Sequence, residues 1–399
     1  MLDRLPGAGT RWRTVALPVG LWMVGAIALH VLVAVAHQLP PLAGGVDYAA
    51  VPAPGLFRGW LSYDSARYLT IAEQGYSYVP GEQSSVGLWP AYPLLVRAVS
   101  VVVPSASVAG LLVTWLAGLG AAVLFWTWLG GRVGERGRRV ALALLLVWPF
   151  AFYLYGTAYA EAFSLCATIG AFVLLERDRP VAAGLVGAVA AASRPAGPAI
   201  IVGLVALLLI RRGVVWRESA DGDAGRGRRV RVDRRRLHLA DYGVLLSVLG
   251  FGVWCLYLWR RFGDPFVFAT VQEAWDQAPG LRTWLKLDIV DRLRAGEGIS
   301  EGTMTHGLII VAFVAAVPAV VRRFGWGYGL YTAVVVAVSL LGTATFLPAG
   351  RHMLAAFPVF AWAGDRLAER RRAPIYVVAA SAIGLVVFTT MFARGRFVA

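Results

Sequence analysis

The 399-residue chain contains no asparagine, one lysine and two cysteines. Because N-linked glycans need an asparagine, no glycan of that kind can report which side of a membrane a segment occupies. Cys166 and Cys255 both lie within apolar runs, where cysteine usually packs as a small hydrophobic residue. They therefore suggest neither a disulfide framework nor a metal cluster. Asparagine and lysine both have A-rich codons, so their scarcity suggests a bacterial genome of high GC content.

Charged residues are also few, at 15%, while hydrophobic residues make up 58% and the mean hydropathy is +0.64. A soluble globular chain of this length is normally less apolar. A helix needs about 20 mainly apolar residues to cross a bilayer. We therefore expect an all-α polytopic membrane protein that forms a single domain over residues 1–399. The expected spans lie at about 15–36, 106–129, 138–155, 158–175, 181–194, 196–210, 242–260, 306–321, 327–346, 351–365 and 374–393.

Residues 181–210 decide the topology, because this run could form one kinked span or a hairpin of two short helices broken near Arg194, Pro195 and Pro198. Basic residues concentrate on the cytoplasmic side of membrane proteins. With the hairpin, 25 of the 38 lysine and arginine residues face the cytoplasm, against 18 with a single span. The hairpin is therefore the better prediction. Its short arms would need shelter from neighbouring helices.

The hairpin topology predicts a cytoplasmic N-terminus, and with the bacterial origin suggested by codon usage we expect a protein of the bacterial plasma membrane. Segments 37–105 and 261–305 then lie outside, and the segment 211–241, which has 10 arginines, lies inside. Its mix of glycine and charge, without apolar periodicity, predicts a basic tether with no regular structure. A nucleic-acid or anionic-lipid site is the less favoured interpretation. The net charge of +15 thus follows membrane topology, and we expect no nucleic-acid partner.

The first external segment carries the clearest chemical pattern. Ser62 or Asp64 can cap a short helix that Gly75 ends. Asp64, Arg67 and Tyr68 lie at positions i, i+3 and i+4, so they share one face of that helix. A carboxylate at a helix N-terminus is stabilised by the helix dipole, and it could accept a proton from a sugar hydroxyl. The alternative is a structural cap that pairs with Arg67.

The stretch YDSARYLTIAEQGY, followed by GLWPAYPLLVR, resembles the signature of the PIG-V-like mannosyltransferases, which belong to the GT-C membrane glycosyltransferases. Members of that family resemble the second mannosyltransferase of GPI-anchor synthesis. Weaker echoes follow in the family's order, and they are AYAEAFSLC, AASRPAG, FGDPFVFATVQEAW and AGRHMLAAFP. Together these motifs cover most of the chain. Two positions depart from the family pattern, because Arg67 stands in place of an aromatic residue and His352 in place of a tyrosine.

The resemblance implies a GT-C-like helical bundle with a structured first external loop, and an enzyme that transfers mannose or a similar hexose. The donor would be a polyprenyl-phosphate sugar and the acceptor a glycolipid, a polysaccharide or a protein, with inversion at the anomeric carbon. Asp64 would be the general base, and Arg351 with Arg194 would hold the departing phosphate. A lipid-linked donor agrees with the lack of a GxGxxG nucleotide-binding loop in the sequence.

Other polar groups have both a functional and a structural interpretation. Glu161, near the external end of its span, is either a site residue or the partner of Arg194 in an ion pair. Arg194 and Arg351 could instead extend to the membrane interface. His306 or His352 could hydrogen-bond the phosphate, but no histidine has metal-ligand spacing to another ligand. The sequence therefore requires no cofactor, and it leaves open whether a divalent cation takes part.

Aromatic side chains crowd the first external loop, and an interfacial belt is their default interpretation, with sugar stacking as the alternative. They are Trp60, Tyr63, Tyr68, Tyr76, Tyr78, Trp89 and Tyr92. A rival function is a lipid-linked sugar transporter or flippase, since broken helices and buried charges look similar there. A non-catalytic scaffold is the third candidate. The aromatic, aspartate-bearing loop favours the transferase, because a flippase has no need of it.

Overall fold

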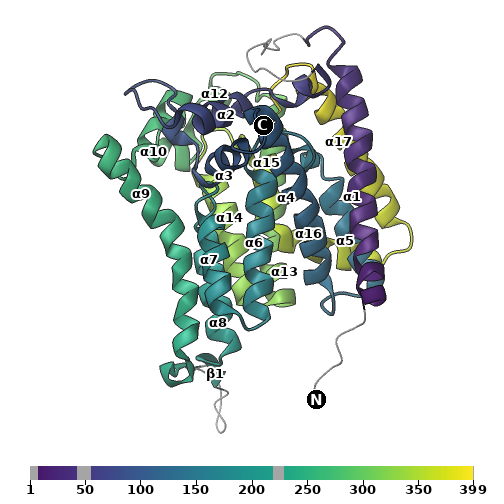
Figure 1. The fold of residues 1–399 in the computed structure, drawn as a ribbon, viewed down its shortest axis with the longest axis vertical. Coiled ribbons are helices and arrows are strands. Elements are labelled where there is room, and N and C mark those ends of the chain that lie inside the picture. Colours follow the sequence, from purple (N-terminus) through teal and green to yellow (C-terminus); the bar gives the residue numbers. More distant parts are fainter. Residues whose placement is uncertain (1–7, 43–54, 219–228, 399) are drawn as a thin grey trace.

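The computed structural model describes residues 8–42, 55–218 and 229–398, and gives side chains for 15–42, 55–214 and 232–398. Helices make up nearly all of its regular structure (Figure 1), which confirms the predicted all-α class. The helices of the main bundle are α1 (Ala8–Ala36), α4 (Ala106–Leu129), α5 (Glu135–Leu146), α6 (Glu161–Glu176), α7 (Pro180–Ala191), α8 (Ala199–Arg211), α9 (Val248–Phe262), α13 (Glu301–Phe324), α14 (Trp326–Leu341), α16 (Phe357–Ala368) and α17 (Ala373–Ala393).

Several bundle helices have the length and composition of membrane spans. Within the described residues five segments qualify, and they are Val15–Ala36, Ala106–Leu129, Leu239–Phe262, Glu301–Phe324 and Ala373–Ala393. In the third of these, a 3-10 helix at Leu239–Ser247 leads directly into α9. Each predicted span has a helical counterpart in the bundle, although some boundaries differ.

Several predicted spans end or begin at other residues than expected, and three of them illustrate this. Helix α5 ends at Leu146 instead of continuing to 155, because Pro149 lacks the N–H that a continued helix needs. The chain then forms a separate 3-10 helix at Ala151–Leu154. Helix α14 ends at Leu341 instead of 346, and α16 begins at Phe357 instead of 351.

Residues 181–210 form two helices, α7 and α8, separated by a turn at 192–198. Helix α8 returns to the end of the molecule where α7 began, since Arg212 after α8 lies 2.7 Å from Asp178 before α7. This arrangement confirms the hairpin over the single kinked span.

The short arms of this hairpin are sheltered by close contact with the segment that follows it. A Cβ atom placed on Gly184 of α7 would lie 1.9 Å from the carbonyl oxygen of Gly243. A Cβ atom on Gly250 of α9 would lie equally close to the carbonyl oxygen of Ala188. Small residues allow helices inside a membrane to approach this closely and to gain packing energy. The expectation that α7 needs neighbours is met by these contacts.

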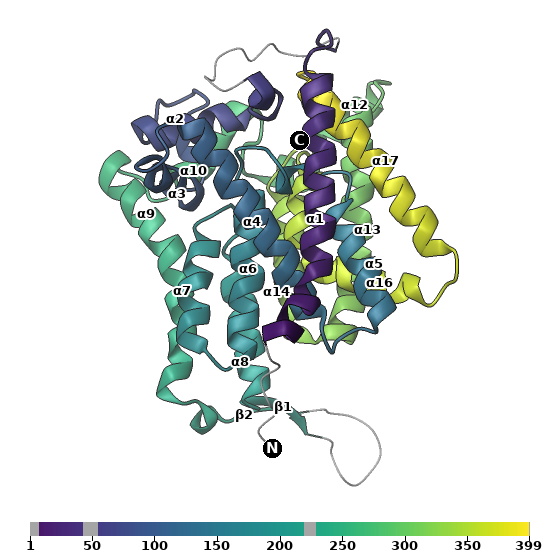
Figure 2. The ribbon, with the colours of Figure 1, turned by 45° about the vertical axis from the view of Figure 1, so that its right-hand side comes forward.

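The described parts of the basic segment 211–241 lie at the same end of the bundle as the start of α1 (Figures 1 and 2). Contrary to our prediction it contains regular structure, since β1 (Val215–Glu218) pairs with the antiparallel strand β2 (Arg229–Val232). The Arg-Val-Arg-Val pattern of β2 has the period of two that favours a strand. The part of the predicted tether at 219–228 lies outside the described residues.

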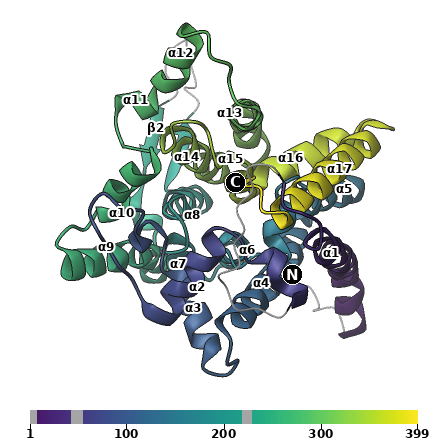
Figure 3. The same cartoon turned by 90° about the horizontal axis from the view of Figure 1, so that it is seen from above.

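Short helices form a cap at the opposite end of the bundle (Figure 3). They are α2 (Asp64–Gln74), α3 (Ala91–Ser100), α10 (Val267–Thr270), α11 (Leu281–Trp284), α12 (Leu287–Arg294) and α15 (Ala349–His352). A second hydrophobic cluster ties the first loop to α9 and α10, with Trp89 stacked on Phe251 at 5.9 Å and Trp254 buried nearby. The first loop is therefore a structured part of the fold, as predicted.

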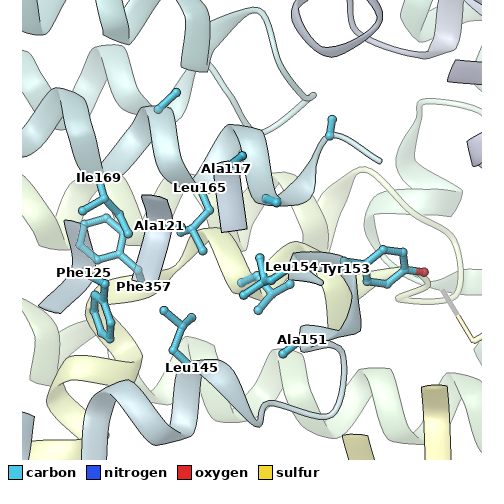
Figure 4. Packing of buried hydrophobic residues seen from close by; sticks show 14 of the residues in the cluster. Ala117, Ala121, Phe125, Leu145, Ala151, Tyr153, Leu154, Leu165, Ile169 and Phe357 are labelled. Atoms are coloured by element: carbon cyan, nitrogen blue, oxygen red, sulfur yellow. The ribbon is translucent and has the colours of Figure 1, made fainter. Parts of the chain in front are cut away.

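The main core lies where α4, α5, α6 and α16 meet (Figure 4). Representative core side chains from these four helices are Phe125, Leu145, Ile169 and Phe357. The 3-10 helix at Ala151–Leu154 packs so tightly on α4 that a Cβ atom on Gly118 would lie 2.0 Å from the Leu154 carbonyl oxygen. This rigid packing fixes the short connection to α6, and so places Glu161 at the cap end of the bundle.

Candidate active site

A cavity of about 460 Å³ lies between the cap and the bundle. Its lining includes all but one of the residues that the sequence proposed for the site, namely Asp64, Arg67, Tyr68, Glu161, Arg194, Arg351 and His352. The exception is His306, which is not part of the lining. Apolar side chains from the other cap segments and from the end of α14 line it as well, among them Phe268, Trp275, Trp284 and Leu341. The fold thus brings polar residues from four separate segments to one cavity that is also partly apolar.

Asp64 is the first residue of α2, and that helix ends before Gly75 as predicted. Neither Ser62 nor Asp64 caps the helix, contrary to our prediction, because the position before the helix is Tyr63 and it makes no side-chain cap. Instead, the backbone N–H of Asp64 donates to the Tyr159 hydroxyl at 3.0 Å. The Asp64 carboxylate is therefore left for partners across the cavity.

Tyr63 holds the backbone in a strained conformation immediately before Asp64. Its φ angle is 59°, in the left-handed region that bulky side chains rarely adopt. The Tyr63 hydroxyl donates to the Gly395 carbonyl oxygen, and its ring lies 4.9 Å from that of Phe397, which also lines the cavity. The C-terminal segment therefore helps to fix the start of α2. No sequence pattern suggested this contact.

Two arginines and two carboxylates form a connected ion-pair network in the cavity. Arg351 Nη1 lies 3.0 Å from Asp64 Oδ2, and Arg351 Nε lies 3.5 Å from Glu161 Oε1. Arg194 Nη2 lies 3.1 Å from the same Glu161 oxygen. The Asp64 side chain is 24% exposed, whereas that of Glu161 is 2% exposed. Asp64 is therefore the acid of this network that a substrate can reach.

The network resolves the alternatives that the sequence left open for its members. Glu161 pairs with Arg194, and its second oxygen, Oε2, is buried without a hydrogen-bond partner. Interface snorkelling is wrong for both arginines, because the side chains of Arg194 and Arg351 are only 9% and 12% exposed. Arg351 does not open α16 but lies in the short helix α15, with its guanidinium 5.2 Å from the ring centre of Tyr159.

Arg67 and Tyr68 lie on the cavity side of α2 but in different surroundings. Arg67 does not pair with Asp64, since its Nη2 donates to Gln83 Oε1 at 2.6 Å and its guanidinium lies 5.0 Å from the Trp275 ring centre. Tyr68 is buried, with its ring edge-on to that of Tyr92. Burial, reinforced by the charge of Glu161, raises the pKa of the Tyr68 hydroxyl. Tyr68 therefore stays protonated and can donate a hydrogen bond.

The two histidines proposed as phosphate ligands differ in position. His352 lines the cavity, and its Nδ1 lies 3.1 Å from the Ser339 hydroxyl oxygen. His306 Nδ1 instead accepts a hydrogen bond from the Gly350 N–H at 2.9 Å, so its ring holds α15 in place. His37 lies at the cap end of α1, with Nδ1 3.4 Å from the Ala393 carbonyl oxygen. Among the residues with described side chains, no three His, Cys, Asp or Glu groups cluster as a metal site.

The interpretation of the first-loop aromatics as an interfacial belt is wrong for several of them. Trp60, Trp89 and Tyr92 are at most 2% exposed, so they pack inside the protein. Trp60 fits there because Gly156 faces it, where a Cβ atom would lie 2.5 Å from the indole ring. The site residues that sequence reasoning missed are Gln83, Tyr153, Ser339 and Phe397. Phe397 lines the cavity, and the other three contact residues that line it. None of the four belongs to a recognisable motif, so only the fold reveals these contacts.

No protein-family model matches the chain, and a search of curated proteins finds no match either. Among solved structures, the chain is similar to the Archaeoglobus fulgidus oligosaccharyltransferase in complex with Zn and sulfate, with a TM-score of 0.47 and 14% identity. The match covers 92% of this chain and 53% of that chain, so this chain spans about half the length of that protein. A similarity this low assigns no family. The PIG-V-like relationship remains a hypothesis carried by the sequence motifs.

Proposed function

We propose that the protein is a membrane glycosyltransferase of the GT-C type. It would transfer mannose, or a similar hexose, from a polyprenyl-phosphate sugar to an acceptor hydroxyl of a glycolipid, a polysaccharide or a protein. The observation that carries this proposal is the Asp64–Arg351 pair, 3.0 Å apart, in a cavity that is charged on one part of its lining and apolar on another. The charged part suits a sugar and its phosphate, and apolar side chains such as Phe268 and Leu341 suit a prenyl chain.

In the proposed reaction, Asp64 accepts the proton of the acceptor hydroxyl while the hydroxyl oxygen attacks the anomeric carbon of the sugar. The bond between that carbon and the phosphate oxygen breaks, so the polyprenyl phosphate leaves with one additional negative charge. Attack from the side opposite the leaving group inverts the anomeric configuration. Asp64 is suited to this role because it is the exposed acid of the network.

Arg351 would couple the proton transfer to the departure of the phosphate. In the resting network its charge is balanced by Asp64 and Glu161. When Asp64 takes the proton it becomes neutral, at the moment when the phosphate gains a charge. The guanidinium can then donate to the phosphate oxygens, with Arg194 and His352 as further donors on the same cavity. Tyr68, which stays protonated, can donate to a sugar hydroxyl.

The proposed location is the bacterial plasma membrane, with the cavity on the extracytoplasmic side. Two features support it. The cap and the N-terminal end of α1 lie at opposite ends of the bundle (Figure 1). The positive-inside rule assigns the basic segment 211–241 to the cytoplasm, and its described parts lie at the end of the bundle where α1 begins, away from the cap.

The test uses membranes of a bacterial host that expresses the chain, supplied with radiolabelled polyprenyl-phosphate mannose. Label should appear in the lipid, polysaccharide or protein fraction. The Asp64→Asn variant should reduce the initial rate by about 10²–10⁴-fold, the usual contribution of a general base. Glu73→Gln is the matched control, because Glu73 lies on the same helix but is exposed and outside the cavity. Transfer that Asp64→Asn leaves unchanged would remove Asp64 from its role.

The transporter alternative is separated by a second measurement on the same protein. The purified chain is placed in sealed liposomes with the labelled donor in one leaflet, and both leaflets are sampled over time. Movement of the sugar lipid between leaflets, without transfer of sugar in any fraction, would favour a flippase. Sugar transfer without movement would support the enzyme.

A further inference from the structure

The charges that line the cavity do not cancel. The ion-pair network of Asp64, Glu161, Arg194 and Arg351 is neutral as a set, because two acids meet two arginines. Arg67 is the fifth charged residue of the lining, and it pairs with no carboxylate in the described part of the chain. The cavity therefore carries one excess positive charge, and that charge lies on Arg67.

The surroundings of Arg67 hold its guanidinium in a fixed direction. One face lies over the Trp275 ring at 5.0 Å, and Nη2 donates to Gln83 Oε1 at 2.6 Å. The Gln83 amide is itself oriented, since its Nε2 donates to the Ala274 carbonyl oxygen at 3.2 Å. Arginine has five N–H donors, and Gln83 accepts from only one of its nitrogens. The other donors are left for a ligand in the cavity.

A structural tie between α2 and the turn at Val271–Trp275 is the simplest alternative role for this arginine. Such a tie uses the stacking on Trp275 and one donor to Gln83, and it gives no role to the other N–H donors of the guanidinium. Arg67 is half-buried and lacks a carboxylate partner among the described residues, so an anionic ligand in the cavity would stabilise its charge. The pattern of a stacked, oriented guanidinium is also the one that proteins use to bind planar or tetrahedral oxyanions.

We propose that Arg67, Trp275 and Gln83 form a subsite for an anionic group, a phosphate or a carboxylate, carried by one of the two substrates. This inference rests on the proposed transferase function. Two sources fit the same chemistry, the phosphodiester of the donor and an acidic group on the acceptor. Arg67 follows Asp64 by three residues on one helix face, so the bound anion would lie about one helical turn from the proposed base.

Two matched pairs of probes distinguish the sources. Geranyl phosphate and geraniol represent the donor side with and without its charge, and octyl glucuronide and octyl glucoside represent an acidic and a neutral acceptor. Their affinities are measured on the full-length protein in detergent, for wild type, Arg67→Gln, Arg67→Lys and the control Arg97→Gln. Arg97 is exposed and outside the cavity, so its substitution removes the same charge without touching the subsite.

We expect Arg67→Gln to weaken one anionic probe by about 10-fold or more and to leave its neutral partner unchanged. Arg67→Lys keeps the positive charge but loses the planar, two-pronged donor geometry of arginine. Its affinity for that probe should lie between those of wild type and Arg67→Gln. A loss of affinity for geranyl phosphate assigns the subsite to the donor, and a loss of affinity for octyl glucuronide assigns it to the acceptor. The subsite is overturned if Arg67→Gln weakens neither anion, or weakens charged and neutral probes alike.

The outcome for the overall function is separate. If wild-type protein fails to bind geranyl phosphate, the lipid-phosphate donor is wrong, whether or not Arg67 recognises the acidic glycoside. If wild type binds geranyl phosphate, and Arg67→Gln binds both geranyl phosphate and octyl glucuronide with the affinity of wild type, only the subsite is wrong. A thermal unfolding scan of each variant confirms that changes in affinity are not caused by unfolding.

Discussion

The guanidinium of Arg351 lies 3.0 Å from the carboxylate of Asp64, although 287 residues separate the two in sequence. Tyr63, the residue immediately before Asp64, has a φ angle of 59° in the left-handed region. Strain of this kind persists where the surrounding structure enforces it, and it gathers at functional sites. The Asp64 side of the pair is thus positioned by a backbone conformation that bulky residues rarely adopt.

The coupling of Arg351 to Asp64 can be measured directly. Arg351→Gln should lower the transfer rate by about 10²-fold, as expected for loss of a donor to the leaving group. In an Asp64→Asn background the same substitution should have a much smaller effect, because both residues act in one step. Initial rates of the two single variants and the double variant give the answer. Fully additive losses would show that the two residues act independently.

Glu161 should matter mainly for stability. Glu161→Gln leaves Arg194 buried beside a neutral group, and breaking a buried ion pair usually costs about 3–5 kcal/mol. We therefore expect a clear fall in the thermal unfolding temperature in detergent. The double variant Glu161→Gln with Arg194→Gln should recover part of that loss. An unfolding temperature unchanged by Glu161→Gln alone would contradict the buried pair.

Lys286, the single lysine of the chain, should titrate at unusually low pH. Its ammonium donates to the carbonyl oxygens of Thr283, Leu340 and Thr343 in the described structure, and burial lowers its pKa from 10.5 to about 8. With lysine labelled by carbon-13, the protein gives one Cε signal, and its midpoint should lie near pH 8. A midpoint near 10.5 would mean that the side chain is solvated.

The lowered pKa of Lys286 also fixes the direction in which the free energy of unfolding changes with pH. Between about pH 8 and 10.5 the unfolded lysine still holds its proton while the folded one has released it. The unfolded state then binds more protons, so this group makes the free energy of unfolding rise with pH across that window. Replacing Lys286 with methionine should remove this contribution to the slope of the free energy of unfolding against pH.

Close packing of α7 should make one glycine intolerant of even a methyl group. In Gly184→Ala the new Cβ atom would lie 1.9 Å from the Gly243 carbonyl oxygen, so the two segments must move apart. Overpacking of this kind costs about 1–3 kcal/mol. Gly252→Ala on α9 is the matched control, since no atom lies within 4 Å of its added Cβ. Thermal unfolding should separate the two variants, and equal behaviour would contradict the packing.

The topology predicts that residues at the two ends of the bundle face opposite sides of the membrane. A single cysteine is placed at Val79 or at Leu239, both exposed, in a chain whose Cys166 and Cys255 are replaced by alanine. A membrane-impermeant thiol reagent added to intact cells should label the cysteine at 79 and not the one at 239. Lysis should expose the second. Labelling of 239 in intact cells would reverse or overturn the predicted orientation.

The arrangement of spans could be predicted because it follows from one-dimensional properties of the chain. The length of each apolar run predicts a helix, and the distribution of basic residues favours the hairpin at 181–210. Boundaries were less predictable where a single residue decides them. Pro149 ends α5 inside an otherwise apolar run, which a hydropathy average does not register.

The site was predictable to the extent that its residues belong to motifs. Asp64, Arg194 and Arg351 each stand in a short pattern, and all three line the cavity. Their pairing was not predictable, because ion pairs between distant segments depend on how helices pack. The Asp64–Arg351 contact and the role of Phe397 therefore required the structure.

The contact between Tyr63 and Gly395 has a practical consequence for handling the protein. An affinity tag joined after residue 399 would follow Gly395 by only four residues, and Gly395 contacts Tyr63 at the start of α2. Such a tag would disturb this contact. Activity lost with such a tag would report on the tag and not on the proposed function. A tag placed before α1, which begins at the opposite end of the bundle, leaves that contact undisturbed (Figure 1). Preparations for kinetic work should carry it there.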